Sequence, residues 1–283
     1  MTDTHTLTGK SRIAGIFGWP VDHSRSPRLH GYWLREFGID GAYIPFATHP
    51  SKLEQGIRAL PALGFRGGNI TLPHKERALA LVDDVTPLAR RIGAINMLVV
   101  REDGTILGDN SDGFGFIANL QQVQSGWRGA TGPAVLLGAG GAARAIVVSL
   151  LDAGVPELRL VNRTTRRAEE IAEAVGGAIK VLPWDARADA LKDAALLVNS
   201  TNLGMAGQAP LELDLRNLPK EAVVYDIVYV PLMTDLLKAA HQRGNRIVDG
   251  IGMLLHQGRP GFKTWFGQDA QVTPELRAFV LGA

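Results

Sequence analysis

Short apolar runs alternate with polar turns and amphipathic segments along all 283 residues of the chain. In the first part of the chain the runs are bounded by glycine or polar residues, which is typical of strands. These strands are expected at residues 13–17, 42–46, 67–71, 95–100 and 106–108. Helix starts lie between them. Ser26 precedes a proline and is expected to be an N-cap, and Ser51 with Glu54 has the spacing of a capping box.

The same alternation resumes after Pro133. Six further strands, separated by helices, are expected at residues 135–137, 158–161, 180–182, 196–199, 223–227 and 246–248. Alternating strands and helices predict an α/β fold, in which helices cover both faces of a mostly parallel sheet. We therefore expect one α/β domain in residues 1–111 and a Rossmann-type domain in residues 112–250. Two C-terminal helices in residues 251–283 would pack back on the first domain.

A glycine-rich turn follows the first strand of the second domain. Gly138, Gly140 and Ala143 have the G-x-G-x-x-G/A spacing of a dinucleotide-binding turn. The first glycine permits a tight turn, the second lets backbone amides approach a pyrophosphate, and the third small residue allows close helix–strand packing. The helix N-terminus adds a partial positive charge. The residues expected to bind the cofactor here are Gly138, Ala139, Gly140, Gly141 and Ala142.

The next strand ends in basic residues. Where an NAD site normally carries Asp or Glu for the ribose 2′-hydroxyl, this chain has Asn162, Arg163 and Thr164, and Arg167 follows. A guanidinium matches the geometry of a phosphate and can stack on adenine. An ordinary basic loop is the alternative, but cations at a helix start oppose the helix dipole. The sequence therefore predicts NADP rather than NAD as the cofactor.

Composition narrows the possible partners. The chain has no cysteine, which excludes disulfides, thiolate metal sites and cysteine nucleophiles, and no metal site is expected. The net charge is only +2 and the basic residues are scattered, so we expect no nucleic-acid partner. The polar N-terminus lacks the apolar core of a signal peptide, and no apolar run suits a membrane helix. We expect a cytoplasmic monomer or homodimer that binds a small molecule and no membrane.

Polar clusters lie at four expected strand ends of the first domain, at residues 24–27, 69–75, 93–96 and 109–112. Each alone has an ordinary explanation, such as helix capping by Ser26 or Asp112, or a solvated Lys75. Asn69 and Thr71 alternate with an apolar residue, so both point to one face of a strand. Because ligands of open α/β sheets bind beyond the carboxyl ends of strands, the four clusters together predict a pocket for a polyhydroxylated ligand.

These residues carry a resemblance to the shikimate dehydrogenase family. The resemblance runs in order over nearly the whole chain, through residues 17–27, 69–75, 110–113, 162–164 and 252–257. It implies a substrate domain formed by the N-terminal part and the last helices, with an NADP domain between them. It also implies reversible hydride transfer between NADPH with 3-dehydroshikimate and NADP with shikimate, a step of aromatic amino-acid biosynthesis.

The same resemblance implies roles for single residues. Lys75 and Asp112 would form the catalytic pair and would both contact the substrate, whose carboxylate would be bound by Ser24 and Ser26. The ring hydroxyls would be bound by Asn69, Thr71, Asn96, Asp112 and Gln257. The cofactor would be bordered by Thr201 and Ile227, and the junction of substrate and nicotinamide by Tyr229 and Gly250.

Three residues depart from the family's usual pattern. Gly31, Met97 and Ser111 stand where asparagine, threonine and threonine are common, and Met97 bears on substrate preference. The nearest alternative is a quinate or quinate/shikimate dehydrogenase with relaxed substrate or NAD use. Others are an enzyme for an amino analogue of shikimate, a folate-type dehydrogenase, and a ligand-binding homologue without turnover. The paired serines favour shikimate, and the presence of Lys75 and Asp112 favours turnover.

Overall fold

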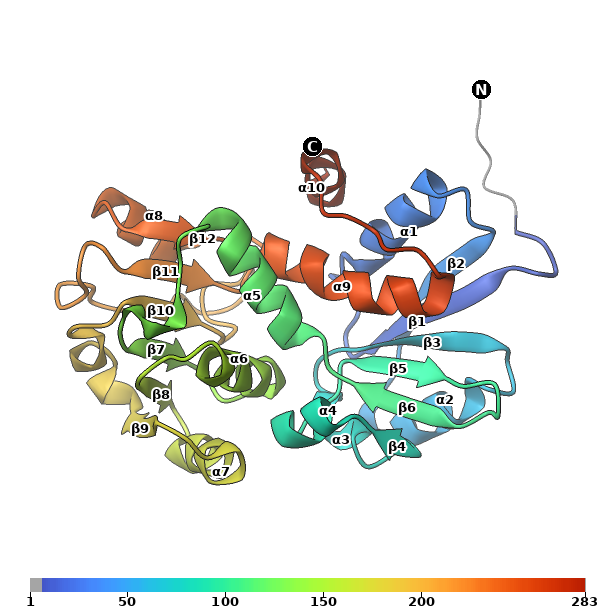
Figure 1. The fold of residues 1–283 in the computed structure, drawn as a ribbon, viewed down its shortest axis with the longest axis horizontal. Coiled ribbons are helices and arrows are strands. Elements are labelled where there is room, and N and C mark those ends of the chain that lie inside the picture. The colour runs from blue at the N-terminus through green and yellow to red at the C-terminus, as the bar shows by residue number, and fades with distance from the viewer. Residues whose placement is uncertain (1–6, 283) are drawn as a thin grey trace. The chain divides into compact units, whose positions relative to one another are not determined.

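The computed structural model describes residues 7–282. The first six residues of the N-terminal segment, on which the expectation of no signal peptide depends, therefore lie outside the described residues. The structure divides into two units, which we call the first unit (Met1–Ser111 and Leu254–Ala283) and the second unit (Asp112–Met253). Each unit contains one six-stranded sheet with helices packed on it (Figure 1). The α/β fold class predicted from the sequence is confirmed.

The sheet of the first unit has the strand order β2-β1-β3-β5-β6-β4. Its strands are β1 (Arg12–Gly18), β2 (Gly41–Ala47), β3 (Phe65–Ile70), β4 (Asp84–Val85), β5 (Met97–Val100) and β6 (Ile106–Asp109). β1 pairs in parallel with β2 and β3, whereas β5 is antiparallel to both β3 and β6. Each strand predicted from the apolar runs is present. The two-residue strand β4 was not predicted, because it is too short to show a period.

Helices cover both faces of this sheet. They are α1 (Ser26–Glu36), α2 (Leu53–Ala59), α3 (Lys75–Ala78), α4 (Pro87–Ile92), α10 (Pro274–Leu281) and most of α9 (Ile251–Phe266). A one-turn 3₁₀ helix (Pro50–Lys52) precedes α2. On one face, Leu53 and Ile57 of α2 join Ile70 and Leu98 of the sheet in an apolar core. The packing on the opposite face is rich in aromatic side chains. They include Trp33 of α1 and Phe262 of α9, whose ring centroids lie 5.1 Å apart.

The C-terminal helix α10 is tied to α1 by arginines. The Arg25 guanidinium donates to the backbone carbonyl of Val280 at 2.8 Å, and the Arg28 guanidinium donates to that of Phe279 at 2.8 Å. Arg28 also lies over the Phe279 ring at 5.2 Å. Cations are favourable near carbonyls in the last turn of a helix, and the Phe279 carbonyl accepts from the Gly282 amide as well as from Arg28. Since Arg25 lies between Ser24 and Ser26, α10 braces the serine loop.

Two capping predictions were wrong. Ser26 is the first residue of α1 rather than its cap, and Arg25 occupies the cap position without a side-chain hydrogen bond. Ser51 lies in the 3₁₀ helix, where its amide donates to the ring of His49, and α2 begins later without a side-chain cap. In both places a proline lies in the first turn of the helix: Pro27 in α1 and Pro50 in the 3₁₀ helix. Because proline favours the start of a helical turn, the serine hydroxyl is not needed as a cap.

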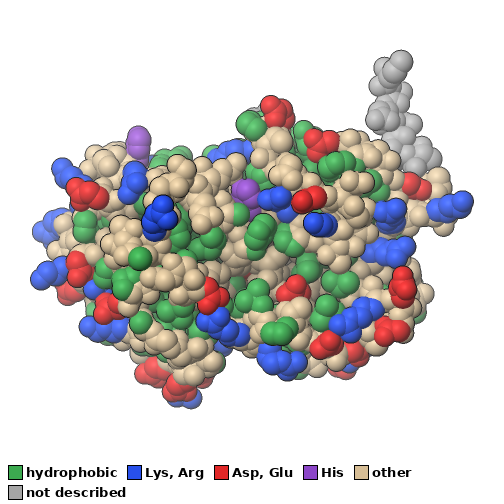
Figure 2. Space-filling model, in the orientation of Figure 1, with side chains coloured by type: hydrophobic (Ala, Val, Ile, Leu, Met, Phe, Trp, Pro, Cys, Tyr) green, Lys and Arg blue, Asp and Glu red, His purple; other side chains and the backbone are tan. Residues whose placement is uncertain are grey.

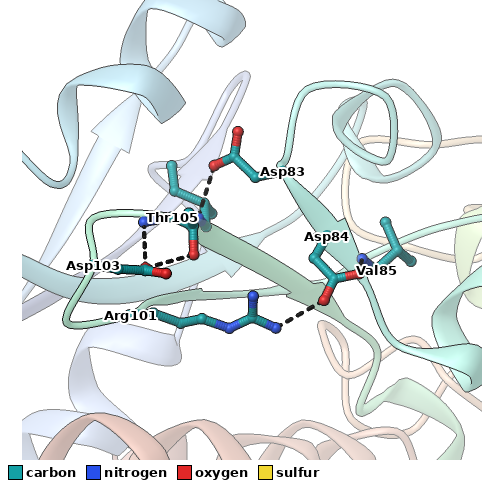
Figure 3. Close-up of polar contacts among 7 residues, drawn as sticks. Asp83, Asp84, Val85, Arg101, Asp103 and Thr105 are labelled. Atoms are coloured by element: carbon teal, nitrogen blue, oxygen red, sulfur yellow. Dashed lines mark hydrogen bonds and ion pairs between the residues drawn. The ribbon is translucent and has the colours of Figure 1, made fainter.

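The β5–β6 hairpin is held by acidic side chains at its turn (Figure 3). The carboxylate of Asp103 accepts from the amide and the hydroxyl of Thr105 at 2.9 and 2.7 Å. These two hydrogen bonds lower the pKa of Asp103. Arg101 pairs with Asp84 of the short strand β4 at 2.8 Å, and Asp83 accepts from the Ile106 amide at 2.8 Å. The turn and β4 are thus fixed to each other at the edge of the sheet.

The sheet of the second unit has the strand order β12-β11-β10-β7-β8-β9 with every pairing parallel. Its strands are β7 (Ala134–Leu137), β8 (Leu158–Asn162), β9 (Ile179–Pro183), β10 (Leu196–Asn199), β11 (Val223–Asp226) and β12 (Arg246–Val248). Counted within this unit the order is 6-5-4-1-2-3, which is the doubly wound arrangement of dinucleotide-binding proteins. The order reverses between β7 and β10, and ligands of such sheets bind at that point.

Alternate residues of these strands enter different cores. Ala134 and Leu136 of β7 face one core, and Val135 and Leu137 face the other, as the period of two requires. The first core is covered by α5 (Asp112–Val123), α6 (Gly141–Asp152) and α7 (Thr165–Val175), and the second is covered in part by α8 (Asp235–Gln242). The unit also contains short 3₁₀ turns at Gly129–Thr131, Trp184–Arg187 and Asp189–Leu191.

Three features of the described residues bear on membrane, charged and metal partners. No helix in the described part of the chain is long and apolar enough to cross a membrane. Figure 2 shows Lys and Arg side chains interspersed with Asp and Glu on the face that it presents. Among residues 7–282, no group of three or more His, Cys, Asp or Glu side chains is placed to hold a metal ion.

Gly67 of β3 allows a close approach that another residue would block. Its φ is +144°, and a Cβ there would collide with the Leu98 carbonyl oxygen and, at 2.5 Å, with Nε1 of Trp265. That Nε1–H donates to the same carbonyl at 2.9 Å. We expect Gly67→Ala to lower the free energy of unfolding by about 3 kcal/mol or more, since it adds a steric clash to backbone strain.

Urea denaturation of the two glycine variants would measure this effect. Gly64 is the matched control, because its φ is +72° but a Cβ there would meet nothing within 4 Å. Gly64→Ala should therefore cost only about 1 kcal/mol of backbone strain. Equal losses in the two variants would show that the close approach at Gly67 contributes nothing.

Candidate active site

A buried polar network lies where β3 and β5 meet in the first unit. Asn69, near the end of β3, is 4% exposed, and Asn96, just before β5, is 2% exposed. The Asn69 Nδ2 donates to the backbone carbonyl of Asn96 at 3.0 Å, and the Asn69 Oδ1 accepts from the Tyr43 hydroxyl at 2.5 Å. Buried amides are costly unless they are hydrogen-bonded, so this geometry is strongly constrained.

The side chain of Asn96 connects three distant segments. Its Oδ1 accepts from the Ser111 amide at 2.8 Å, and its Nδ2 donates to Oε1 of Gln257 in α9 at 3.1 Å. The Ser111 hydroxyl in turn donates to the Gln257 backbone carbonyl at 2.9 Å. The fold thus brings together, in one cluster, three residues that the family resemblance implied separately: Asn69, Asn96 and Gln257. Ser111, noted above only as a departure from the family pattern, is part of it.

The two serines lie on the loop that leads into α1. The Ser26 amide donates to the Ser24 hydroxyl at 3.3 Å. Ser26 is buried and its side chain is hydrogen-bonded to the Tyr43 hydroxyl, whereas Ser24 is half-buried. Because Tyr43 also contacts Asn69, the serine loop and the amide cluster belong to the same network.

The two residues expected to be catalytic begin helices. Lys75 is half-buried and is the first residue of α3, and its backbone carbonyl accepts from the Ile95 amide at 2.9 Å, next to Asn96. Asp112 is 4% exposed and is the first residue of α5, directly after Ser111 in the chain. Thr71 is half-buried just beyond β3, and its amide donates to the Phe17 carbonyl at 2.9 Å.

In the second unit the glycine-rich turn lies at the point where the strand order reverses. Gly138 follows β7 with a φ of +109°, and a Cβ there would lie 2.7 Å from the Ser200 hydroxyl and 3.1 Å from the Thr201 side chain. Thr201 follows β10, so the turn touches the loop after the neighbouring strand. Ala139 is 5% exposed, Gly141 is buried, and Gly140 and Ala142 are half-buried.

This turn fits a cofactor diphosphate. A Cβ on Gly140 would meet nothing within 4 Å, so the backbone here borders open space. No side chain caps the N-terminus of α6, which starts at Gly141. The first amides of the helix are therefore available to an anion, and the helix dipole favours negative charge there.

The end of β8 presents polar and basic residues to solvent. Asn162 is half-buried, and its Nδ2 donates to the Thr164 carbonyl at 2.8 Å, which shapes the turn into α7. Arg163, Thr164 and Arg167 are exposed at the start of α7. No carboxylate occupies the end of β8. The residues present therefore suit the 2′-phosphate of NADP better than the 2′-hydroxyl of NAD.

A second buried polar network supports the loops after β10 and β11. Asp226, at the end of β11, accepts from Nδ2 of Asn199 at 3.0 Å, from the Val228 amide at 3.0 Å and from the Thr234 hydroxyl at 2.7 Å. Asn199 uses its Oδ1 to accept from the Thr201 hydroxyl at 2.7 Å. The network holds Thr201 beside the glycine-rich turn.

Two more expected cofactor residues lie together. Gly250 is buried against Ile227, and a Cβ at this position would collide with the Ile227 carbonyl oxygen. Only glycine allows that approach. Tyr229 is half-buried on the segment after β11, two residues beyond Ile227.

Sequence reasoning missed the residues that support these sites. Tyr43 looks like an ordinary aromatic position of a strand, yet its hydroxyl contacts Asn69 and Ser26. His30 looks like an ordinary helix residue, yet its ring stacks on Tyr43. Asn199 and Asp226 lie in two predicted strands, at residues 196–199 and 223–227, but were not singled out as site residues. A polar residue at the end of an otherwise apolar strand is the signal that could have identified Asn199 and Asp226. No local signal exists for Tyr43.

The two units and their sites define a class of protein. It is an α/β protein in which a doubly wound dinucleotide-binding unit is joined to a second α/β unit with a buried amide network.

The model of the shikimate dehydrogenase substrate binding domain matches residues 16–98, and the model named shikimate / quinate 5-dehydrogenase matches residues 121–207. The proteins named shikimate dehydrogenase (NADP(+)) from Paramagnetospirillum magneticum and Rhodospirillum rubrum are 60% and 58% identical to this chain. The alignments cover 97% and 98% of this chain and 100% and 99% of those proteins. The chain belongs to the shikimate dehydrogenase family.

Solved structures are similar over nearly their whole length. A shikimate dehydrogenase in complex with NADP+ has a TM-score of 0.89 and 30% identity, with 98% of this chain and 97% of that chain covered. The Thermus thermophilus enzyme in complex with NADP(H) and shikimate has a TM-score of 0.84 and 35% identity, with 96% and 99% covered. A quinate dehydrogenase from Corynebacterium glutamicum in complex with NAD has a TM-score of 0.88 and 30% identity, with 96% and 99% covered.

Asp226 makes the stability of the protein depend on pH. Burial raises the pKa of this carboxyl to about 6, although the three hydrogen bonds oppose the shift. In the unfolded chain the group has an ordinary pKa, so the folded state binds its proton more tightly. Its contribution to stability is therefore largest below pH ~4, declines as the pH rises towards ~6, and is constant above that.

We expect Asp226→Asn to remove a decline of about 3 kcal/mol in the free energy of unfolding over this range. Thr234→Val deletes a hydrogen bond that lowers the pKa of Asp226, so the decline should begin at the same pH but extend to a higher one. Urea denaturation at a series of pH values would test both variants. An unchanged pH profile in Asp226→Asn would mean that Asp226 is not the group responsible.

Proposed function

We propose that this chain is an enzyme that reversibly reduces 3-dehydroshikimate to shikimate with NADPH, in the biosynthesis of aromatic amino acids. The observation that carries the proposal is the 60% identity, over 97% of the chain, with a relative named shikimate dehydrogenase (NADP(+)). The exposed arginines at the end of β8 and the amide network of the first unit support it.

In this proposal the substrate is bound by residues 1–111 and 251–283, and NADP by residues 112–250. Ser24 and Ser26 bind the substrate carboxylate. The ring hydroxyls are bound by Asn69, Thr71, Asn96, Asp112 and Gln257. The hydrogen bonds between Asn69, Asn96 and Gln257 support this assignment, because they set the direction of each amide before a ligand arrives.

The catalytic pair consists of Lys75 and Asp112. Addition of hydride to a ketone carbon leaves negative charge on the oxygen, and a positioned proton donor lowers that barrier. The Lys75 ammonium gives its proton to this oxygen, and the Asp112 carboxylate orients the ammonium. In the opposite direction the neutral Lys75 amine accepts the proton of the alcohol. NADPH, when bound, supplies the hydride.

The remaining assignments concern the cofactor. Gly138, Ala139, Gly140, Gly141 and Ala142 bind its diphosphate with backbone amides. The adenosine 2′-phosphate is bound by Asn162, Arg163, Thr164 and Arg167. Thr201 and Ile227 border the nicotinamide part, and Tyr229 and Gly250 lie at its junction with the substrate. The enzyme acts in the cytoplasm as a monomer or homodimer without a nucleic-acid partner.

The second candidate is a quinate/shikimate dehydrogenase that also uses NAD. The likeness to a quinate dehydrogenase in complex with NAD favours it, as does the name of the family model. Initial rates with shikimate or quinate and NADP or NAD, followed by the absorbance of the reduced nicotinamide, would separate the two. We expect the shikimate–NADP pair to have the highest kcat/KM. A higher value for either NAD pair would favour the second candidate.

We expect Lys75→Ala to lower kcat by about 10²–10⁴-fold with little change in the KM for shikimate, since the lost group acts on charge that develops during reaction. Steady-state kinetics in both directions would measure it. Lys52→Ala removes an exposed lysine of the same unit and is the control. A kcat near that of the wild type would remove Lys75 from the catalytic role.

We expect Arg163→Ala to raise the KM for NADP by about 10-fold or more, because a charge-assisted hydrogen bond to phosphate is lost. The KM for NAD should change less than two-fold. Arg166→Ala is a matched control, since Arg166 lies in the first turn of α7, three residues after Arg163, but pairs with Glu170 at 3.2 Å. Equal effects on NADP and NAD would contradict a 2′-phosphate role for Arg163.

A further inference from the structure

Tyr43 joins the two parts of the first unit that are proposed to bind substrate. It lies on the edge strand β2 and is 8% exposed. Its hydroxyl donates to Oδ1 of Asn69 at 2.5 Å and is hydrogen-bonded to the side chain of Ser26. One phenolic oxygen therefore bridges a residue assigned to the carboxylate and a residue assigned to a ring hydroxyl.

The contacts of Asn69 determine which way its amide points. The backbone carbonyl of Asn96 can only accept a hydrogen bond, so the atom of Asn69 that faces it must be Nδ2. The Oδ1 then faces Tyr43, whose hydroxyl donates to it. One N–H of the Asn69 amide is used by Asn96, which leaves the other N–H for a substrate oxygen.

The ring of Tyr43 is itself held in place. The imidazole of His30 stacks on it with centroids 4.0 Å apart and planes 11° apart, and Trp265 lies 6.1 Å away. His30 is fully buried, and burial lowers its pKa to about 3, so it is a neutral ring at physiological pH. Burial also raises the pKa of Tyr43 well above its ordinary value. The phenol therefore stays a hydrogen-bond donor.

We propose that Tyr43 is a positioning residue for the substrate: its hydroxyl fixes the Asn69 amide so that an N–H faces a substrate hydroxyl, and it links that amide to the carboxylate-binding Ser26. This inference rests on the proposed function. Tyr43 acts through Asn69 and Ser26 rather than by touching the reacting atoms. It therefore governs binding of the substrate more than the chemical step.

Steady-state kinetics of Tyr43→Phe would test the proposal. The variant keeps the aromatic ring and its stacking but deletes the hydroxyl. We expect the KM for shikimate to rise by about 5–50-fold, since a buried hydrogen bond to the amide is lost, with kcat within about two-fold. The KM for NADP should be unchanged. A KM for shikimate within two-fold of the wild type would overturn the proposal.

Tyr225→Phe is the matched control for general loss of stability. Tyr225 is fully buried in the second unit, and its hydroxyl accepts from Nδ2 of Asn119 at 2.7 Å. Both variants delete one buried hydroxyl. We therefore expect a lower Tm for both, which thermal denaturation would measure. Only Tyr43→Phe should raise the KM for shikimate. A similar rise in both variants would indicate a merely structural effect and would contradict the proposal.

A double-mutant cycle with Asn69→Ala tests the route of the effect. If Tyr43 acts through the Asn69 amide, adding Tyr43→Phe to Asn69→Ala should change the KM for shikimate much less than it does in the wild-type background. Any remainder measures the link to Ser26. Full additivity of the two changes would overturn the proposed route. If the wild type itself fails to oxidise shikimate with NADP, the proposed function fails instead, so the two failures are distinct.

Discussion

The side-chain amide of Asn96 is the interaction on which the first unit's site depends. It is buried and uses both its oxygen and its nitrogen, towards Ser111 and Gln257, while its backbone carbonyl holds Asn69. A buried amide without hydrogen bonds lowers the free energy of unfolding. The folded state is therefore most stable when all of its partners are in place at once. The cluster therefore links α9, near the end of the chain, to the end of the sheet, so that the site depends on contacts across the whole unit.

The second unit also contains a buried polar network, which supports the loops beside the glycine-rich turn. Asp226 is a buried carboxyl that collects three hydrogen bonds and thereby fixes the segments after β10 and β11. Its partner Asn199 positions Thr201, which borders the turn at Gly138. In both units, polar groups at strand ends are satisfied by each other, which leaves the neighbouring loops in one conformation.

The proposed chemistry follows from this rigidity. A substrate with several hydroxyls is recognised by donors and acceptors whose directions are already set, so less ordering is needed when it binds. Tyr43 and His30 extend the network away from the substrate residues into the aromatic face of the first sheet. Packing on that face is thereby connected to the orientation of Asn69.

The sequence by itself determined the α/β class, the longer strands, the cofactor turn and NADP as the expected cofactor, because each has a local signal: a run of apolar residues, a glycine spacing, or basic residues after a strand. The family resemblance added the site residues. Only the tertiary structure decided that Ser26 is not a cap, that β4 joins the sheet, and that Tyr43 faces Asn69. These facts depend on contacts between residues far apart in the chain, and local composition carries no record of such contacts.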